Sequence, residues 1–178
     1  MATLVRIIDK ISNIFGIIAG IFMILGTVLI VTEVIVRSVF DSTIYITAEY
    51  SAYFMVAVTL FGLAIAMKDK AHIRVTLLHG TVKTGKPRFI LDLYTFIIGF
   101  IVSLFITYSL NAFFWNSFVT GSKSMQLTNT YLAIPQSALV IGSFLLSLQL
   151  FAEILRMIIK WKNDELDETT EESKMLGR

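Results

Sequence analysis

The sequence predicts an all-α integral membrane protein with four transmembrane helices and a short amphipathic helix between the second and third. The first observation is composition: the 178 residues are 56% hydrophobic and 16% charged, with a mean hydropathy of +0.76. A soluble domain is typically about 25% charged. The second is charge placement, because Lys123 is the only Asp, Glu, Lys, Arg or His in residues 93–152. A small soluble domain keeps too much surface wet to bury such a stretch.

The third observation is the length of the uncharged runs, which cover residues 11–32, 50–67, 93–122 and 124–152. A helix needs about 20 apolar residues to cross ~30 Å of hydrocarbon. The first two runs therefore predict one crossing each. The first run is longer than the ~7–15-residue apolar region of a secretory signal and ends without a small-x-small cleavage site. It is interpreted as an uncleaved signal anchor.

The connector between the second and third helices is predicted to contain the amphipathic helix, over residues 71–82. Ile73, Leu77 and Leu78 lie at helical spacing there, among Arg74 and His79. This pattern is typical of a helix that lies in the plane of the membrane interface. A solvated loop with incidental apolar residues is the alternative.

The third and fourth runs, of 30 and 29 residues, are too long for one perpendicular crossing and too short for two. We expect each to combine one tilted helix with part of a polar connector around residues 120–124. Pro135 is expected near the start of the fourth helix, where a missing N–H costs little. Residues 1–163 then form the membrane domain. Residues 164–178 form an acidic tail, with six acids in 164–172, whose composition predicts disorder.

The distribution of Lys and Arg predicts that both termini are cytoplasmic. Thirteen basic residues lie before the first helix, between the second and third, or after the fourth, against only Arg37 and Lys123 on the other side. The positive-inside rule gives the orientation. Because the basic residues border apolar spans, the net charge of +2 does not indicate nucleic-acid binding. Five of them are expected to contact phospholipid headgroups, at ~1 kcal/mol each: Lys68, Lys70, Lys83, Lys86 and Arg88.

The sequence shows no pattern of a catalytic, metal or cofactor site. The absence of cysteine excludes disulfides, Cys-ligated zinc and iron–sulfur clusters. Both histidines, His72 and His79, fall in the charged connector, whereas a bis-histidine haem needs imidazoles facing each other inside a bundle. No catalytic triad, metalloprotease motif or glycine-rich phosphate loop occurs. We expect no enzyme activity and no cofactor.

No predicted span carries an ionisable residue near its middle, which is the usual mark of an ion site or proton relay. Glu33 comes closest, but it lies ~34 Å along a helix from Lys10, near the outer interface. Arg37 at i+4 can pair with it there. An exposed structural pair is the favoured interpretation, and a proton-coupled carboxylate is the alternative.

Small and weakly polar residues recur at helical spacing in every predicted helix, and such stripes let helices approach closely in lipid. The stripes are Gly16 and Gly20, Gly62 and Ala66, Gly99, Ser103, Thr107 and Asn111, and Ser143 and Ser147. They predict close packing, with Gly62 and Ser103 as candidate contacts to another subunit. Contacts within one bundle are the alternative.

Three groups of residues carry a resemblance to a known family. They are Arg37-Ser38-Val39-Phe40 with Ala48-Glu49; Phe61-Gly62-Leu63-Ala64 with Lys68-Asp69-Lys70-Ala71-His72-Ile73-Arg74-Val75; and Ile134-Pro135-Gln136 with Gly142-Ser143, Gln149, Glu153 and Arg156. Their order and spacing over residues 5–160 resemble the small, DctQ-like membrane subunit of tripartite ATP-independent periplasmic (TRAP) transporters. The chain departs from the pattern at Tyr50 and Thr76, where members often have acids.

The resemblance implies a function that composition does not. Such subunits look like partners of a large membrane subunit with the sodium and substrate sites. A periplasmic binding protein delivers the substrate, typically an organic anion such as a carboxylate. The chain would anchor the large subunit in a bacterial or archaeal inner membrane. A stand-alone homo-oligomeric transporter or channel and a structural tetraspan protein remain alternatives, the former with Ser103, Thr107 and Asn111 as its polar path.

The resemblance also implies which residues are candidates for structural or partner contacts. Arg37 and Glu49 are expected at the outer end, as a structural pair or as contacts to the binding protein, with the structural pair favoured. His72 and Arg74 are expected at the inner end of the second helix, as a cap or as contacts to the partner or to lipid phosphate. Pro135 belongs to the third motif.

Overall fold

The computed structural model describes residues 2–69, 86–126 and 128–162, and this part of the chain contains four α-helices. They are α1 (Ala2–Phe40), α2 (Ile46–Lys68), α4 (Lys86–Thr120) and α5 (Ala133–Lys162). All four are long and apolar enough to cross a membrane. The predicted all-α membrane fold with four spans is confirmed. The predicted interfacial helix at 71–82 and the acidic tail at 164–178 lie outside the described residues.

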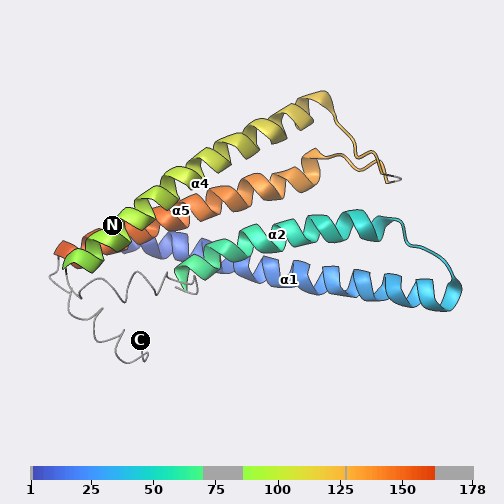
Figure 1. The fold of residues 1–178 in the computed structure, drawn as a ribbon, viewed down its shortest axis with the longest axis horizontal. Helices are drawn as coiled ribbons and strands as arrows, with labels where there is room; N and C mark the ends of the chain where they lie inside the picture. Colours follow the sequence, from blue (N-terminus) through green and yellow to red (C-terminus); the bar gives the residue numbers. More distant parts are fainter. Residues whose placement is uncertain (1, 70–85, 127, 163–178) are drawn as a thin grey trace.

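The helices form two antiparallel hairpins, α1 with α2 and α4 with α5 (Figure 1). The hairpins meet through α2 and α5, and α5 packs against all three other helices. One end of the molecule holds Ala2, Lys68, Lys86 and Lys162, and is called the terminal end here; the loops 41–45 and 121–132 form the loop end. The helices lie closest at the terminal end and spread apart toward the loop end (Figure 1).

The helix ends at the loop end follow from local chain chemistry. Gly121, directly after α4, has φ +62°, the left-handed conformation that glycine adopts without strain. The Ser122 N–H then donates to the Ser117 carbonyl at 3.1 Å, which closes α4 in a Schellman motif. After α1, Asp41 has φ 51°, a conformation that Asp tolerates better than most residues. At the start of α5, Pro135 lies in the first turn, as predicted.

Buried apolar residues gather where α1, α2 and α5 meet. The larger cluster consists of Ala19, Ala57, Phe61, Ala64 and Leu145, and a smaller one joins α1 to α5 at the terminal end. Within its most apolar window α5 is 44% buried, against 6% for α4. The fold is therefore an open array of helices around α5, with α1 and α4 mostly uncovered.

A close helix approach occurs at Gly142, which the predicted stripes did not include, and only some glycines of those stripes lie close to another helix. A Cβ on Gly142 would lie 2.5 Å from Leu60 Cβ and 3.4 Å from the Leu60 carbonyl carbon, so α5 touches the α2 backbone there. A Cβ on Gly16 would meet only the tip of Ile65, at 2.5 Å. A Cβ on Gly62 or Gly20 would meet no atom of another described segment within 4 Å. At Gly62 the predicted close packing is therefore absent within the described chain, because this position on α2 faces open space.

Candidate functional site

The largest fully buried side chain among the described residues joins α1 to α5 near the terminal end. Gln149 is fully buried and accepts a hydrogen bond from the Ser12 hydroxyl through Oε1, at 2.7 Å. Its Nε2 donates to Asp9 Oδ1 at 3.2 Å. An amide in an apolar layer is costly unless it is hydrogen-bonded. These two bonds fix the register of α5 against α1.

Arg156 adds a second set of polar contacts between α1 and α5. Its guanidinium donates to Asp9 on α1 and to Glu153 on its own helix, so one cation neutralises two carboxylates. The Arg156 side chain is 27% exposed and the Glu153 side chain 7%. Asp9, Ser12, Gln149, Glu153 and Arg156 are called the terminal-end network below. The i, i+4, i+7 spacing of its α5 members was visible in the sequence, but their partners on α1 were not.

A further contact at the terminal end involves a residue that was predicted to bind lipid. Lys68, the last residue of α2, donates to Asn13 Oδ1 on α1 at 2.5 Å and lies 3.6 Å from the Asp69 carboxylate. Its side chain is only 23% exposed. The ammonium group thus ties the end of α2 to α1.

At the loop end, Glu33 holds the α1–α2 turn. Its carboxylate accepts hydrogen bonds from Arg37 and from the Ile44 backbone N–H, both at 2.6 Å. The Arg37 side chain is 65% exposed, but the Glu33 side chain is only 8% exposed. The predicted Glu33–Arg37 pair forms. The expectation that the pair is exposed was wrong for Glu33, because the chain returning at Ile44 covers its carboxylate.

Glu49 lies in the first turn of α2 and is buried. Its carboxylate accepts hydrogen bonds from the Tyr53 hydroxyl at 2.5 Å and from the Thr128 hydroxyl in the α4–α5 loop. It therefore links the two hairpins at the loop end. The favoured Arg37–Glu49 pair was wrong, because Arg37 reaches Glu33 one turn earlier on its own helix and Glu49 is engaged elsewhere.

The predicted polar stripe on α4 divides between two faces. Ser103 is buried and donates to the Phe100 carbonyl at 2.8 Å. Thr107 Oγ1 lies 3.1 Å from Ser147 Oγ on α5. Asn111 is exposed. Each i+4 step turns a helix by ~40°, so the third residue leaves the α5 interface. The stripe is not one continuous polar path within the described chain.

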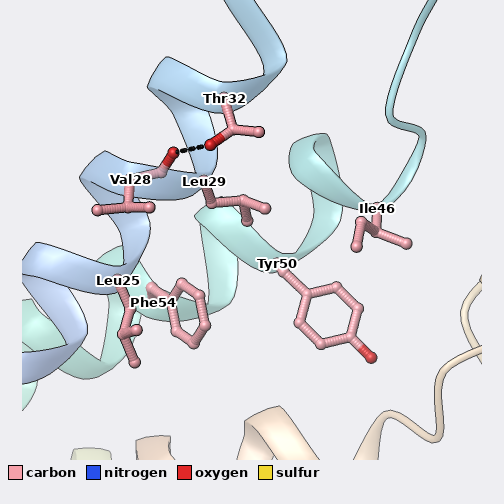
Figure 2. A pocket seen from close by; sticks show the side chains of 7 residues that line it. All are labelled: Leu25, Val28, Leu29, Thr32, Ile46, Tyr50 and Phe54. Carbon is pink, nitrogen blue, oxygen red and sulfur yellow. Dashed lines mark hydrogen bonds between the residues drawn. The ribbon is translucent and has the colours of Figure 1, made fainter. Parts of the chain in front are cut away.

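A shallow groove of about 300 Å³ lies between α1 and α2 toward the loop end. Figure 2 shows its apolar wall, with Leu25 on α1 beside Phe54 on α2 and Leu29 between the two helices. The Thr32 hydroxyl donates to the Val28 carbonyl, and the Tyr50 hydroxyl points away from this wall (Figure 2). The groove offers apolar surface and no charged group.

The remaining candidate residues are not brought together into one site. Pro135 is half-buried at the start of α5. His72, Arg74, Lys70 and Lys83 lie outside the described residues, as do the side chains of Lys86 and Arg88 in the first turn of α4. Among the residues that the structure describes, no group of three or more His, Cys, Asp or Glu could hold a metal ion.

The described polar groups thus join helices and loops to one another, in an open four-span membrane protein. A search of curated proteins found no match. Residues 26–160 match the family model described as tripartite ATP-independent periplasmic transporters, DctQ component. The chain belongs to this family, whose members are small permease components of TRAP transporters. The family assignment made from the motifs is confirmed.

Proposed function

We propose that this chain is the scaffold of a TRAP-type secondary transporter. In this proposal it holds a large, sodium-coupled membrane subunit in the bilayer for uptake of a carboxylate-type organic anion. A periplasmic binding protein delivers that anion. Both termini and the 70–85 connector face the cytoplasm, as the basic residues indicate. The chain itself carries no transport chemistry.

The proposal rests on a contrast within the described chain. Four carboxylates are hydrogen-bonded inside the chain, whereas the apolar surfaces of α1 and α4 are uncovered. The carboxylates of Asp9, Glu33, Glu49 and Glu153 each accept a hydrogen bond from within the chain. Large apolar residues on the two outer helices are at least half exposed: Ile17, Met23, Ile24 and Val34 on α1, and Ile101, Phe105, Phe113 and Phe118 on α4. Such a surface suits packing against another membrane protein and lipid.

Purification of the tagged chain from its native membrane in mild detergent tests the proposal. We expect a larger membrane protein to co-purify in a fixed ratio. Vesicles with both proteins and a binding protein should take up an organic anion along a sodium gradient. Vesicles that contain this chain alone are the control and should take up none. Sodium-driven uptake by the chain alone would contradict the scaffold role and favour a homo-oligomeric transporter.

The role of Glu33 gives a specific prediction. Glu33→Gln keeps an amide oxygen that can accept the Ile44 N–H, and Arg37 is exposed enough to be hydrated instead. We therefore expect uptake by the complex to stay within about twofold of wild type, with unchanged sodium dependence. The matched change Glu33→Leu removes the acceptor and should lower the stability of the chain by about 1–3 kcal/mol. Loss of ion-driven uptake in an intact Glu33→Gln complex would identify Glu33 as a coupling site.

A further inference from the structure

Two neighbouring faces of α4 have different surroundings. One face packs on α5 through Gly99 and Thr107, with Ser103 buried between them. A second face, about a third of a turn around the helix from the first, is exposed throughout and is called the outer seam: Ile97, Ile101, Leu104, Tyr108, Asn111, Trp115 and Phe118. Its members alternate at spacings of four and three, the pattern by which one helix packs along another. Among the residues that the structure describes, no helix lies against the outer seam, since α4 forms one edge of the array (Figure 1).

The polar residues of the outer seam lie inside the apolar layer. Tyr94 and Trp115, exposed aromatic residues near the two ends of α4, are ~32 Å apart along the helix axis. This distance matches a hydrocarbon thickness of ~30 Å between two interfacial aromatic belts. Tyr108 and Asn111 then lie ~10 Å and ~6 Å inside the belt at Trp115.

Asn111 indicates that the outer seam contacts a protein rather than lipid. Its side chain is exposed and makes no hydrogen bond within the described parts of the chain. A carboxamide that faces acyl chains loses its bonds to water without gaining others. Ser109, also exposed, differs because a serine hydroxyl can bond to the carbonyl one turn earlier in its own helix. The Tyr108 hydroxyl, on a side chain that is 74% exposed, adds a second polar group to the outer seam.

We propose that the outer seam of α4 is the contact for one transmembrane helix of the large subunit. That helix presents small residues opposite Tyr108 and Trp115, and a hydrogen-bonding side chain or freed backbone carbonyl opposite Asn111. The assignment of this partner helix to the large subunit depends on the proposed scaffold function. A second copy of this chain fits less well, because self-association would set Tyr108 against Tyr108 and Trp115 against Trp115, whereas close helix pairs in membranes favour small residues at the contact.

Site-specific crosslinking tests which face is occupied. A photoreactive amino acid is placed at Leu104 or Tyr108 on the outer seam, and at Phe105 or Phe113 on the next exposed face of α4 as the matched control. The complex is irradiated in native membranes and then purified through the tagged chain. We expect adducts with the large subunit from the outer-seam positions and none above background from the control positions.

Substitution of Asn111 tests the hydrogen bond. Asn111→Leu should weaken association with the large subunit about three- to tenfold, as expected for the loss of one interhelical hydrogen bond. It should leave the stability of the isolated chain unchanged, since Asn111 has no partner within the described chain. Asn111→Gln keeps the amide and should retain most of the affinity. Ser109→Leu is the control substitution and should leave association unchanged.

The possible outcomes separate this inference from the proposed function. If the complex co-purifies but the outer seam yields no adduct with the large subunit, or Asn111→Leu associates as wild type does, the inference is wrong and the scaffold role stands. Adducts between two copies of this chain would also overturn it. If no large membrane protein co-purifies with the wild-type chain, the proposed function itself fails.

Discussion

Replacing Gly142 with alanine is expected to destabilise the packed chain by about 1–3 kcal/mol, the usual cost of overpacking a close contact. The new methyl group would lie 2.5 Å from Leu60 Cβ, 3.2 Å from the Phe61 ring and 3.4 Å from the backbone of Leu60. Two of these neighbours are held by the α2 backbone, so α5 must move away from α2. The change is measured by titrating the detergent-solubilised protein with a denaturing detergent.

Three other glycines provide the controls for Gly142→Ala. Gly16→Ala would meet only the Ile65 Cδ1 atom, the far end of a flexible side chain, so its cost should be smaller. Gly20→Ala and Gly62→Ala add a methyl group into open space and should not destabilise the isolated chain. A loss of stability for Gly62→Ala equal to that for Gly142→Ala would contradict the placement of α2 against α5.

Removal of the cation from the terminal-end network is expected to have the second large effect. Arg156→Met leaves the carboxylates of Asp9 and Glu153 side by side without their shared partner. An exposed ion pair contributes only about 0–1 kcal/mol, whereas breaking a buried pair costs about 3–5 kcal/mol. Because Arg156 and Asp9 are partly exposed while Glu153 is buried, we expect an intermediate loss of about 2 kcal/mol in the same detergent titration.

The matched control is Arg37→Met, which also removes a guanidinium bonded to a glutamate on its own helix. Arg37 is 65% exposed, against 27% for Arg156, so its loss should cost less than about 1 kcal/mol. Adding Asp9→Asn to Arg156→Met should recover part of the lost stability, because it removes one uncompensated charge. Equal losses for the two arginine variants would show that the terminal-end network does not hold α1 to α5.

The number and kind of helices could be predicted because the bilayer imposes a length and composition that the sequence shows directly. The uncharged runs gave all four spans, and Pro135 marked the first turn of α5. Helix ends were less predictable. The first uncharged run begins at Ile11, but α1 begins at Ala2, because Arg6, Asp9 and Lys10 continue the helix once Asp9 has partners on α5.

The contacts between helices could not be predicted, because helical spacing gives a face but not the neighbour of that face. Gly62 and Gly142 are both glycines in apolar helices, yet only Gly142 touches another backbone. Glu49 was expected beside Arg37, whereas its partner Thr128 lies 79 residues further along the chain. Such pairs depend on how two hairpins meet, and no local pattern encodes that.

The position of α5 has a consequence for biosynthesis. The helix that packs against the other three is the last of the four to leave the ribosome. The α1–α2 hairpin can pair during insertion, but α4 has no described helix to pack along until α5 follows it. Ser12 and Asp9, the partners of Gln149, are therefore synthesised more than a hundred residues before Gln149 itself. Termination between residues 121 and 132 removes α5, so the α1–α2 hairpin and α4 remain in one chain without the helix that both of them contact.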